Sequence, residues 1–308
     1  MERKRARRTS DPPSAGKAPT LTAEQPTPAP SARKAQTPTA LPPPGYVVQR
    51  RESIHVGACS SVGAAEQEEA DSSENFEERT VSLTASESVQ IRQFRELRFC
   101  SGCRLWDSGV ALSRWLCTRG EPDLLDKDVL ELGSGVGMVG LVAARKARRV
   151  RLTDGEPRLL PNLRHNAAQA AKLVAQVDVV ALNWSSDPAE LVAAHGTFHV
   201  LLGADLVYSS GCVAVLARAV RALLRPTGGT LLLCSPSGRH GLLQFTAALE
   251  AEGLRCSEEV LEAELLRDAA CQGEDAEVVA HPFLLLRAVL PPADTVPECV
   301  ERAGVRRS

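Results

Sequence analysis

An apolar segment that leads straight into a glycine-rich turn limits the fold of this chain more than any other feature. The segment is Val129-Leu-Glu-Leu-Gly-Ser-Gly-Val-Gly137, in which Glu131 stands just ahead of three glycines. Glycine has no Cβ, so the backbone of such a turn can approach a ligand closely, and a following helix N-terminus favours bound polar groups. The pattern is typical of the first strand, loop and helix of an α/β nucleotide-binding domain.

From residue 106 onward, short apolar runs alternate with segments of helical periodicity. The expected strands are 128–132, 150–153, 177–182, 199–202, 229–234, 254–260 and 282–290. The expected helices are 110–117, 138–146, 157–173, 188–195, 212–224 and 242–252. This alternation predicts a Rossmann-like α/β fold, with a seven-stranded, mostly parallel sheet that helices cover on both faces.

The first third of the chain has a different composition. Residues 1–45 are rich in Pro, Ala, Ser, Thr and basic residues, and too few apolar side chains are present to offset the entropy of ordering. Residues 62–78 form an acidic loop or linker, and alternation around Val81–Leu83 and Val89–Phe94 predicts a β-hairpin. The predicted domains are a disordered tail (1–45), a β-rich appendage with the acidic loop (46–105), the α/β domain (106–292) and a flexible C-terminal tail (293–308).

Composition also limits where the protein acts and what it binds. The 308 residues carry a net charge of −2, which argues against specific nucleic-acid binding by the whole chain. No apolar run has the roughly 18 residues of a membrane span, and the N-terminus lacks a secretory signal. We therefore predict a monomer in the cytoplasm, with no membrane contact and its nine cysteines mostly as thiols. The basic cluster Arg3–Arg8 is either a solvated tail or a nuclear-import patch, so the nucleus is a second predicted location.

Cys100-Ser-Gly-Cys103 is the only CxxC motif in the chain. A structural zinc site needs a second pair of ligands at similar spacing, and the sequence contains none. We interpret both residues as thiols without a metal, and a redox or metal role as the alternative.

The glycine turn matches two ligand patterns. Glu131-x-Gly133-x-Gly135-x-Gly137 fits S-adenosylmethionine, whereas Gly135-x-Gly137-x-x-Gly140 fits a dinucleotide and leaves a nicotinamide-dependent oxidoreductase as an alternative. Gly135 lies three residues beyond the strand, which is late for the first glycine of a dinucleotide site. A carboxylate at the strand end would also repel a pyrophosphate, but it balances the charge of a cationic sulfonium. Both points favour S-adenosylmethionine as the cofactor.

Three later segments supply further site residues at strand ends, where open α/β sheets bind ligands. Asp154 can accept the ribose hydroxyls. Asn183 and Trp184 end the next strand, where Trp184 packs on either adenine or the core. Trp106 likewise either lines the cofactor site or packs in the core. The candidate site is completed by Ala204, Asp205 and Tyr208 at the end of a later strand.

These motifs together resemble the seven-β-strand protein lysine methyltransferases. Glu131-Leu-Gly-Ser-Gly-Val-Gly137, Leu-Thr-Asp154, Leu-Asn-Trp184 and Ala-Asp205-Leu-Val-Tyr208 carry the resemblance, which spans about residues 80–290. The D-x-x-Y tetrapeptide points to methyltransferase family 16, whose members include calmodulin- and elongation-factor-modifying enzymes. Thr-Asp154-Gly-Glu and Ser235-Pro-Ser-Gly-Arg239 look most like the calmodulin-modifying branch.

The resemblance implies S-adenosylmethionine-dependent methyl transfer to a lysine ε-amine of a protein substrate. It implies that Glu131, Asp154 and the neighbouring site residues border the cofactor, and that Asp205 and Tyr208 are catalytic. The group often has an acid where this chain has Asn183. A small-molecule methyltransferase, with residues 265–277 and the hairpin as a lid, and an inactive binding module are the alternatives. A base-methylating enzyme is disfavoured because the prolines of an N/D-P-P-Y motif are missing.

Overall fold

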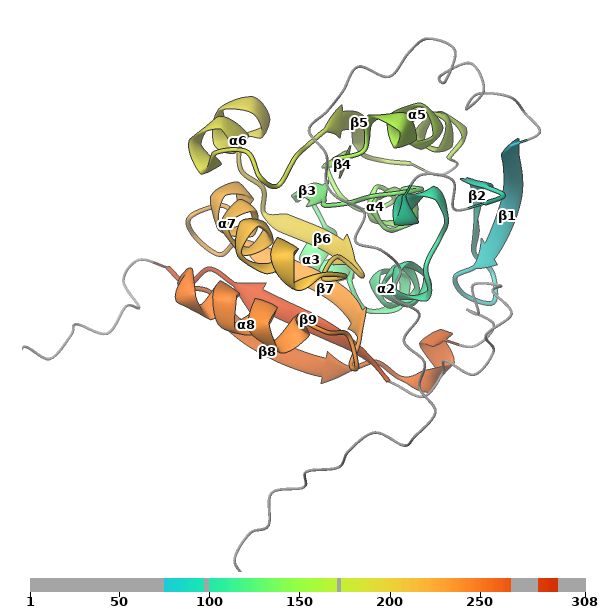
Figure 1. The fold of residues 1–308 in the computed structure, drawn as a ribbon. Helices are drawn as coiled ribbons and strands as arrows, with labels where there is room; N and C mark the ends of the chain where they lie inside the picture. The colour runs from blue at the N-terminus through green and yellow to red at the C-terminus, as the bar shows by residue number, and fades with distance from the viewer. Residues whose placement is uncertain (1–74, 97–99, 171–172, 267–281, 293–308) are drawn as a thin grey trace, which may run out of the picture. The chain divides into compact units, whose positions relative to one another are not determined.

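The computed structural model describes residues 75–96, 100–170, 173–266 and 282–292, which form a seven-stranded sheet with helices on both faces and a two-stranded hairpin (Figure 1). The predictions for the tail 1–45, for most of the acidic loop, for 267–277 and for 293–308 lie outside the described residues. None of the described helices is both long and apolar enough to cross a lipid bilayer.

The main sheet has the strand order β5-β4-β3-β6-β7-β9-β8. Its strands are β3 (Asp128–Glu131), β4 (Arg149–Asp154), β5 (Gln176–Ala181), β6 (Val200–Ala204), β7 (Thr230–Pro236), β8 (Arg255–Val260) and β9 (Phe283–Val289). Pairings among β3 to β7 are parallel, and β9 runs antiparallel to both β7 and β8. The predicted seven-stranded, mostly parallel sheet is confirmed.

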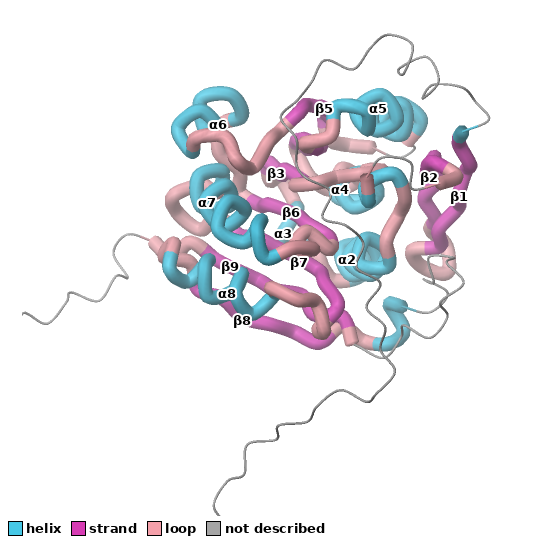
Figure 2. The backbone as a smooth tube through the Cα atoms, viewed as in Figure 1, coloured by secondary structure: helices cyan, strands magenta, loops and turns pink. Residues whose placement is uncertain are grey.

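Two layers of helices enclose this sheet. The helices are α2 (Asp107–Thr118), α3 (Glu121–Leu124), α4 (Met138–Ala143), α5 (Leu160–Gln169), α6 (Pro188–His195), α7 (Val213–Leu223) and α8 (Leu242–Ala251). In Figure 1, α6, α7 and α8 lie along one face, while α2, α4 and α5 lie on the other. Figure 2 shows the same alternation of helices and strands along the chain. Each face has its own apolar core, because successive strand residues point to opposite sides of the sheet.

Several predicted boundaries differ from those observed. The helix expected over 157–173 is a 3-10 turn, Pro157–Leu159, followed by α5, which ends at Gln169. The acidic loop expected to reach residue 78 ends earlier, because Phe76 already begins strand β1 (Phe76–Ser82). Phe76 and Val81 are buried while the side chains between them are largely exposed, so a strand tolerates the glutamates at its start.

The hairpin of β1 and β2 (Ser88–Phe94) is fastened to α5 by two buried amides. The side-chain NH2 groups of Asn162 and Asn166 donate to the carbonyl of Arg92 at 3.0 and 2.8 Å, and the Arg92 N–H donates to Asn166 Oδ1 at 2.9 Å. Val89 and Ile91 of β2 belong to the same core as α2 and α4. The two asparagines, which lie one turn apart on the helix, therefore dock the hairpin.

The turn between β3 and α4 depends on glycine. Gly135 and Gly137 have φ values of 54° and 87°, a left-handed conformation that strains residues with a side chain. Beneath this turn, Glu131 is 3% exposed, and its Oε2 accepts the Gly140 N–H at 3.1 Å. Burial raises the pKa of Glu131 to about 8, although Ser134 and the Gly140 N–H oppose the shift. The carboxyl group thus ties the end of β3 to the first turn of α4.

This buried carboxyl gives a pH dependence of stability that Glu131→Gln should remove. The pKa in the folded protein lies above the ordinary value of 4.5, so the contribution of the protonated group is complete below pH 4.5 and is lost as pH rises through about 8. We expect the free energy of unfolding of the native sequence, relative to the Gln variant, to fall by about 4 kcal/mol from pH 4.5 to 8. Urea unfolding at four pH values measures it, and a constant difference would contradict the assignment.

Candidate functional site

The predicted site residues gather where the direction of chain progression across the sheet reverses. From β3 the chain proceeds outward to β4 and β5, and it then returns to β6 on the other side of β3. Open α/β sheets bind ligands at the carboxyl ends of strands beside such a point. The glycine turn follows β3 and Asp205 follows β6, while Asp154 ends β4. The three motifs singled out in the sequence therefore share one edge of the sheet.

Asp154 is held by backbone N–H groups around it. Its Oδ2 accepts the Gly135 N–H at 2.9 Å, and its Oδ1 accepts the Glu156 N–H at 3.0 Å. Burial raises the pKa of Asp154 above its ordinary value, and these N–H groups oppose that rise. Each carboxylate oxygen can accept a second hydrogen bond, so the group retains acceptor capacity for the hydroxyls of a ligand.

The segment of residues 100–106, which leads into α2, lies directly over the glycine turn. It contains the 3-10 helix η2 (Ser101–Cys103), and a Cβ added to Gly135 would lie 3.0 Å from the Gly102 carbonyl oxygen. A Cβ on Gly102 would lie 3.7 Å from Asp154 Oδ2. Trp106 is 40% exposed, and its indole N–H donates to the Ser101 carbonyl at 2.8 Å. Trp106 was the predicted site residue in this segment, but the observed contact with the turn comes from Gly102.

Cys100 directly precedes η2 and Cys103 ends it, and the two lie on the same side because residues three apart eclipse in a 3-10 turn. Interaction with Cys103, followed by burial and by the charge of Asp154, raises the pKa of Cys100. All six cysteines within the described residues are free thiols, and no group of three or more His, Cys, Asp or Glu residues there has the arrangement of a metal site. The upward shift keeps the Cys100 thiol protonated and therefore a weak nucleophile.

Trp184 and Asn183 have different surroundings. The Trp184 ring lies beside the glycine turn, since a Cβ on Gly133 would be 3.2 Å from Trp184 Cζ2, and the side chain also packs against the core of the α7 face. Asn183 is exposed, and its Oδ1 accepts the Ser185 N–H at 2.9 Å. The asparagine shapes the turn after β5, whereas the tryptophan reaches the glycine turn itself.

Asp205, which follows Ala204 at the end of β6, has an unusual backbone conformation and a side chain that is paired with an arginine. Its φ is 56°, which is uncommon for a residue other than glycine. Arg239 donates from Nε to Oδ1 at 2.7 Å and from Nη2 to Oδ2, so that one guanidinium contacts both carboxylate oxygens. Burial raises the pKa of Asp205, and the charge and hydrogen bonds of Arg239 oppose the rise. Arg239 had no role in the sequence prediction, although its place just after β7 puts it at the same edge.

Tyr208 is 58% exposed beside this pair. Burial of part of the ring, followed by the charges of Cys212, Asp154 and Cys100, raises the pKa of its hydroxyl. Those influences indicate that the Tyr208 hydroxyl lies near Asp154 and Cys100. The exposed phenol therefore belongs to the same edge of the sheet.

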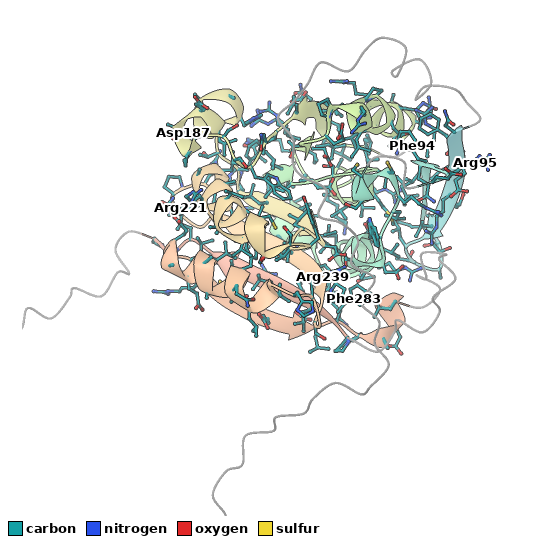
Figure 3. The ribbon with its side chains drawn as sticks, viewed as in Figure 1. Phe94, Arg95, Asp187, Arg221, Arg239 and Phe283 are labelled. Carbon is teal, nitrogen blue, oxygen red and sulfur yellow. The ribbon has the colours of Figure 1, made fainter. Side chains whose placement is uncertain are left out.

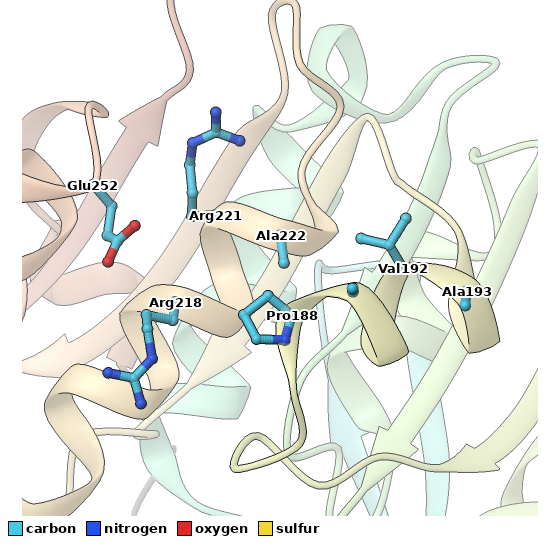
Figure 4. A pocket seen from close by; sticks show the side chains of 8 residues that line it. Pro188, Val192, Ala193, Arg218, Arg221, Ala222 and Glu252 are labelled. Atoms are coloured by element: carbon cyan, nitrogen blue, oxygen red, sulfur yellow. The ribbon is translucent and has the colours of Figure 1, made fainter.

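A separate groove lies between α6 and α7, away from this edge (Figure 4). Pro188, Val192 and Ala193 form one wall, while Arg218 and Arg221 stand on the other, with Glu252 nearby. None of the predicted site residues lines this groove. We therefore treat the strand-end cluster as the candidate functional site.

Comparison with solved structures supports the fold. A putative methyltransferase solved in complex with SAH superposes with a TM-score of 0.50 at 14% identity, over 69% of this chain and 56% of that one. At that level of identity the similarity shows the architecture alone.

Comparison with curated sequences gives closer relatives. The protein N-lysine methyltransferase METTL21A of Danio rerio is 34% identical over 134 residues, which is 42% of this chain and 58% of the relative. The EEF1A lysine methyltransferase 3 of Mus musculus is 29% identical over 157 residues, which is 51% of this chain and 66% of the relative. The match spans less than two thirds of the length of each. A family model described as lysine methyltransferase matches residues 85–252, more than half of the sequence, so the chain belongs to the lysine methyltransferase family.

Proposed function

We propose that this protein transfers a methyl group from S-adenosylmethionine to a lysine ε-amine of a protein substrate. The observation that carries the proposal is the convergence of three motifs at one edge of the sheet: the glycine turn after β3, Asp154, and the Asp205 to Tyr208 segment. Membership of the lysine methyltransferase family supports it. The predicted cytoplasmic and nuclear locations, the monomeric state and the lack of a nucleic-acid partner accompany the proposal as predictions.

The residues at this edge fit S-adenosylmethionine. The glycine turn offers a backbone surface without side chains, and Asp154 retains acceptor capacity for two ribose hydroxyls. Trp184 supplies aromatic surface beside the turn, and Trp106 supplies a second exposed ring, bonded to Ser101 of the segment over the turn. When bound, the cofactor supplies a methyl carbon attached to a cationic sulfur. Glu131 would support this arrangement from beneath, through the backbone of the turn.

Glu131 also disfavours the dinucleotide alternative. A pyrophosphate in such a site binds the free N–H groups at the N-terminus of the helix that follows the glycine turn. Here the Gly140 N–H of α4 is already taken by Glu131 Oε2. A second anion at that position would meet a buried carboxyl group instead of a free donor.

The amine must lose its proton before it can attack a methyl carbon. A free lysine has a pKa near 10.4, so almost all of it lacks a lone pair at neutral pH. Entry into a partly buried site lowers that pKa, because burial disfavours the charged form. Asp205 then orients the neutral amine by accepting its N–H bonds, and Tyr208 forms a wall of the lysine channel. Placement of the nitrogen in line, about 3 Å from the carbon, supplies most of the rate.

Incubation with S-adenosylmethionine carrying a labelled methyl group, in an extract of cells that lack the protein, tests the proposal. We expect label on one or a few proteins, and mass spectrometry should place it on lysine. Label confined to small molecules, or to residues other than lysine, would contradict the proposed substrate class. Asp205→Asn serves as the control that separates transfer by this site from a contaminating activity.

Gly135→Ala should abolish cofactor binding. The substitution strains a left-handed backbone by about 1–2 kcal/mol and places a methyl group 3.0 Å from the Gly102 carbonyl. Gly228→Ala is the matched control, because Gly228 has a φ of 71° but nothing lies within 4 Å of its added Cβ. Calorimetric titration with S-adenosylhomocysteine should show binding by the Gly228 variant and none by the Gly135 variant. Equal affinities would refute the placement of the cofactor.

Asp205→Asn should reduce kcat by roughly 100-fold or more, because the amide replaces one of the two acceptor oxygens that orient the amine and breaks the two-point contact with Arg239. Affinity for S-adenosylhomocysteine should change little, since the cofactor contacts are assigned to other residues. Asp123→Asn is the control: Asp123 is also paired with both donors of one arginine, Arg287, at 2.7 and 3.0 Å, but outside the site. A loss of cofactor binding that parallels the loss of turnover would contradict this division of roles.

A further inference from the structure

The ion pair between Asp205 and Arg239 joins two loops at the edge where the substrate would enter. Asp205 follows β6, and Arg239 lies in the short turn between β7 and α8. Figure 3 shows Arg239 near Phe283, which begins β9 opposite the end of β7. The Asp205 side chain is 10% exposed and the Arg239 side chain 34%, so the carboxylate is buried behind a guanidinium that reaches the surface.

The turn that carries Arg239 is packed against the D-x-x-Y segment. A Cβ on Gly241 would lie 3.1 Å from Val207 Cγ1, and Val207 stands between Asp205 and Tyr208 in the chain. The Arg239 N–H donates to the Pro236 carbonyl at 3.0 Å, which closes the turn around the end of β7. The backbone that presents the guanidinium is therefore fixed against the residues that the proposed function places around the amine.

A planar guanidinium that binds both oxygens of a carboxylate fixes its orientation as well as its charge. Buried carboxylates without a partner take up a proton, and a left-handed residue such as Asp205 needs support from its surroundings. Arg239 meets both requirements. Each Asp205 oxygen can still accept a further hydrogen bond, so an amine can bind beside the pair.

We infer that Arg239 is a positioning residue for methyl transfer: it holds Asp205 in the orientation that receives the substrate amine, and its positive charge favours the neutral, nucleophilic form of that amine. The inference rests on the proposed function. A lone carboxylate would attract an ammonium and keep it protonated, whereas a carboxylate already paired with a guanidinium offers acceptor atoms without net negative charge.

Other ionisable groups lie close to the pair or beside it in the chain. The charge of Asp205 reaches Cys234 on β7, and the charges of Cys212, Asp154 and Cys100 reach Tyr208 after β6. His240 follows Arg239 in the same turn. Burial, helped by the charge of Asp205, raises the pKa of Cys234. These groups are the same in the native protein and in variants at position 239, so a difference between pH profiles isolates the contribution of the guanidinium.

Arg239→Gln and Arg239→Lys separate charge from geometry. The rate constant kcat is measured from pH 6 to 10 with the protein that the native enzyme labels in the extract. The Gln variant should lose at least tenfold in kcat at pH 7. The acidic limb of its pH–rate profile, where kcat rises with pH, should move up by about one pH unit or more, because one positive charge near the amine is removed. The Lys variant keeps the charge and loses the two-point contact, so its limb should stay within about 0.3 unit while kcat falls about threefold or more.

Arg287→Gln is the matched control, because Arg287 forms the same two-point contact with Asp123 outside the site. It should keep the native limb and kcat. Binding of S-adenosylhomocysteine, measured by calorimetry, shows that each variant is folded. If the Gln variant does not bind S-adenosylhomocysteine, the Lys variant tests the inference instead. A kcat of the Lys variant equal to that of the native enzyme would then overturn the role of the two-point contact.

An unshifted limb in a folded Gln variant, or an effect on KM alone, would overturn the inference while leaving the proposed function intact. A native enzyme that labels no protein would contradict the proposed function itself.

Discussion

The turn between β3 and α4 is the constraint on which the other parts of the site depend. Its glycines adopt left-handed backbone, which lets β3 pass into α4 within six residues and leaves no side chain on the ligand side. Glu131 fixes the turn from beneath through Gly140, Asp154 fixes it from β4 through Gly135, and Gly102 packs on it from above. These contacts hold three separate segments of the chain together at one edge of the sheet.

Charge at this edge is organised by burial. Glu131, Asp154 and Asp205 all have raised pKa values, chiefly because each is removed from water. The groups that stabilise the three buried acids differ. Glu131 and Asp154 accept hydrogen bonds from backbone N–H groups, whereas Asp205 is held by the guanidinium of Arg239. At the opposite edge of the sheet, Asp128, which begins β3, pairs with Arg148. At the carboxyl edge, each acid is thus buried with a partner, and Asp154 and Asp205 keep acceptor capacity for a ligand and for an amine.

The sheet could be predicted from sequence because its strands are short, continuous apolar runs separated by helical periodicity. The position of β9 between β7 and β8 could not be predicted in this way, because it depends on which strands pair with each other across the sheet. The glycine turn, Asp154 and Asp205 were predictable because each follows a strand directly. Partners from distant segments were not: nothing in the local pattern reveals that Arg239 pairs with Asp205 or that Gly102 covers Gly135. The burial of Asn162 and Asn166 also depends on a distant segment, because the hairpin that they bind covers them.

The proposed roles of these residues all depend on where the methyl donor binds, and a crystal structure with S-adenosylhomocysteine tests that location most directly. It should show the ribose hydroxyls on Asp154, the nucleoside between the glycine turn and the Ser101 to Trp106 segment, and the sulfur directed toward Asp205 and Tyr208. A ligand bound elsewhere on the protein, or an empty edge at saturating ligand, would contradict the account.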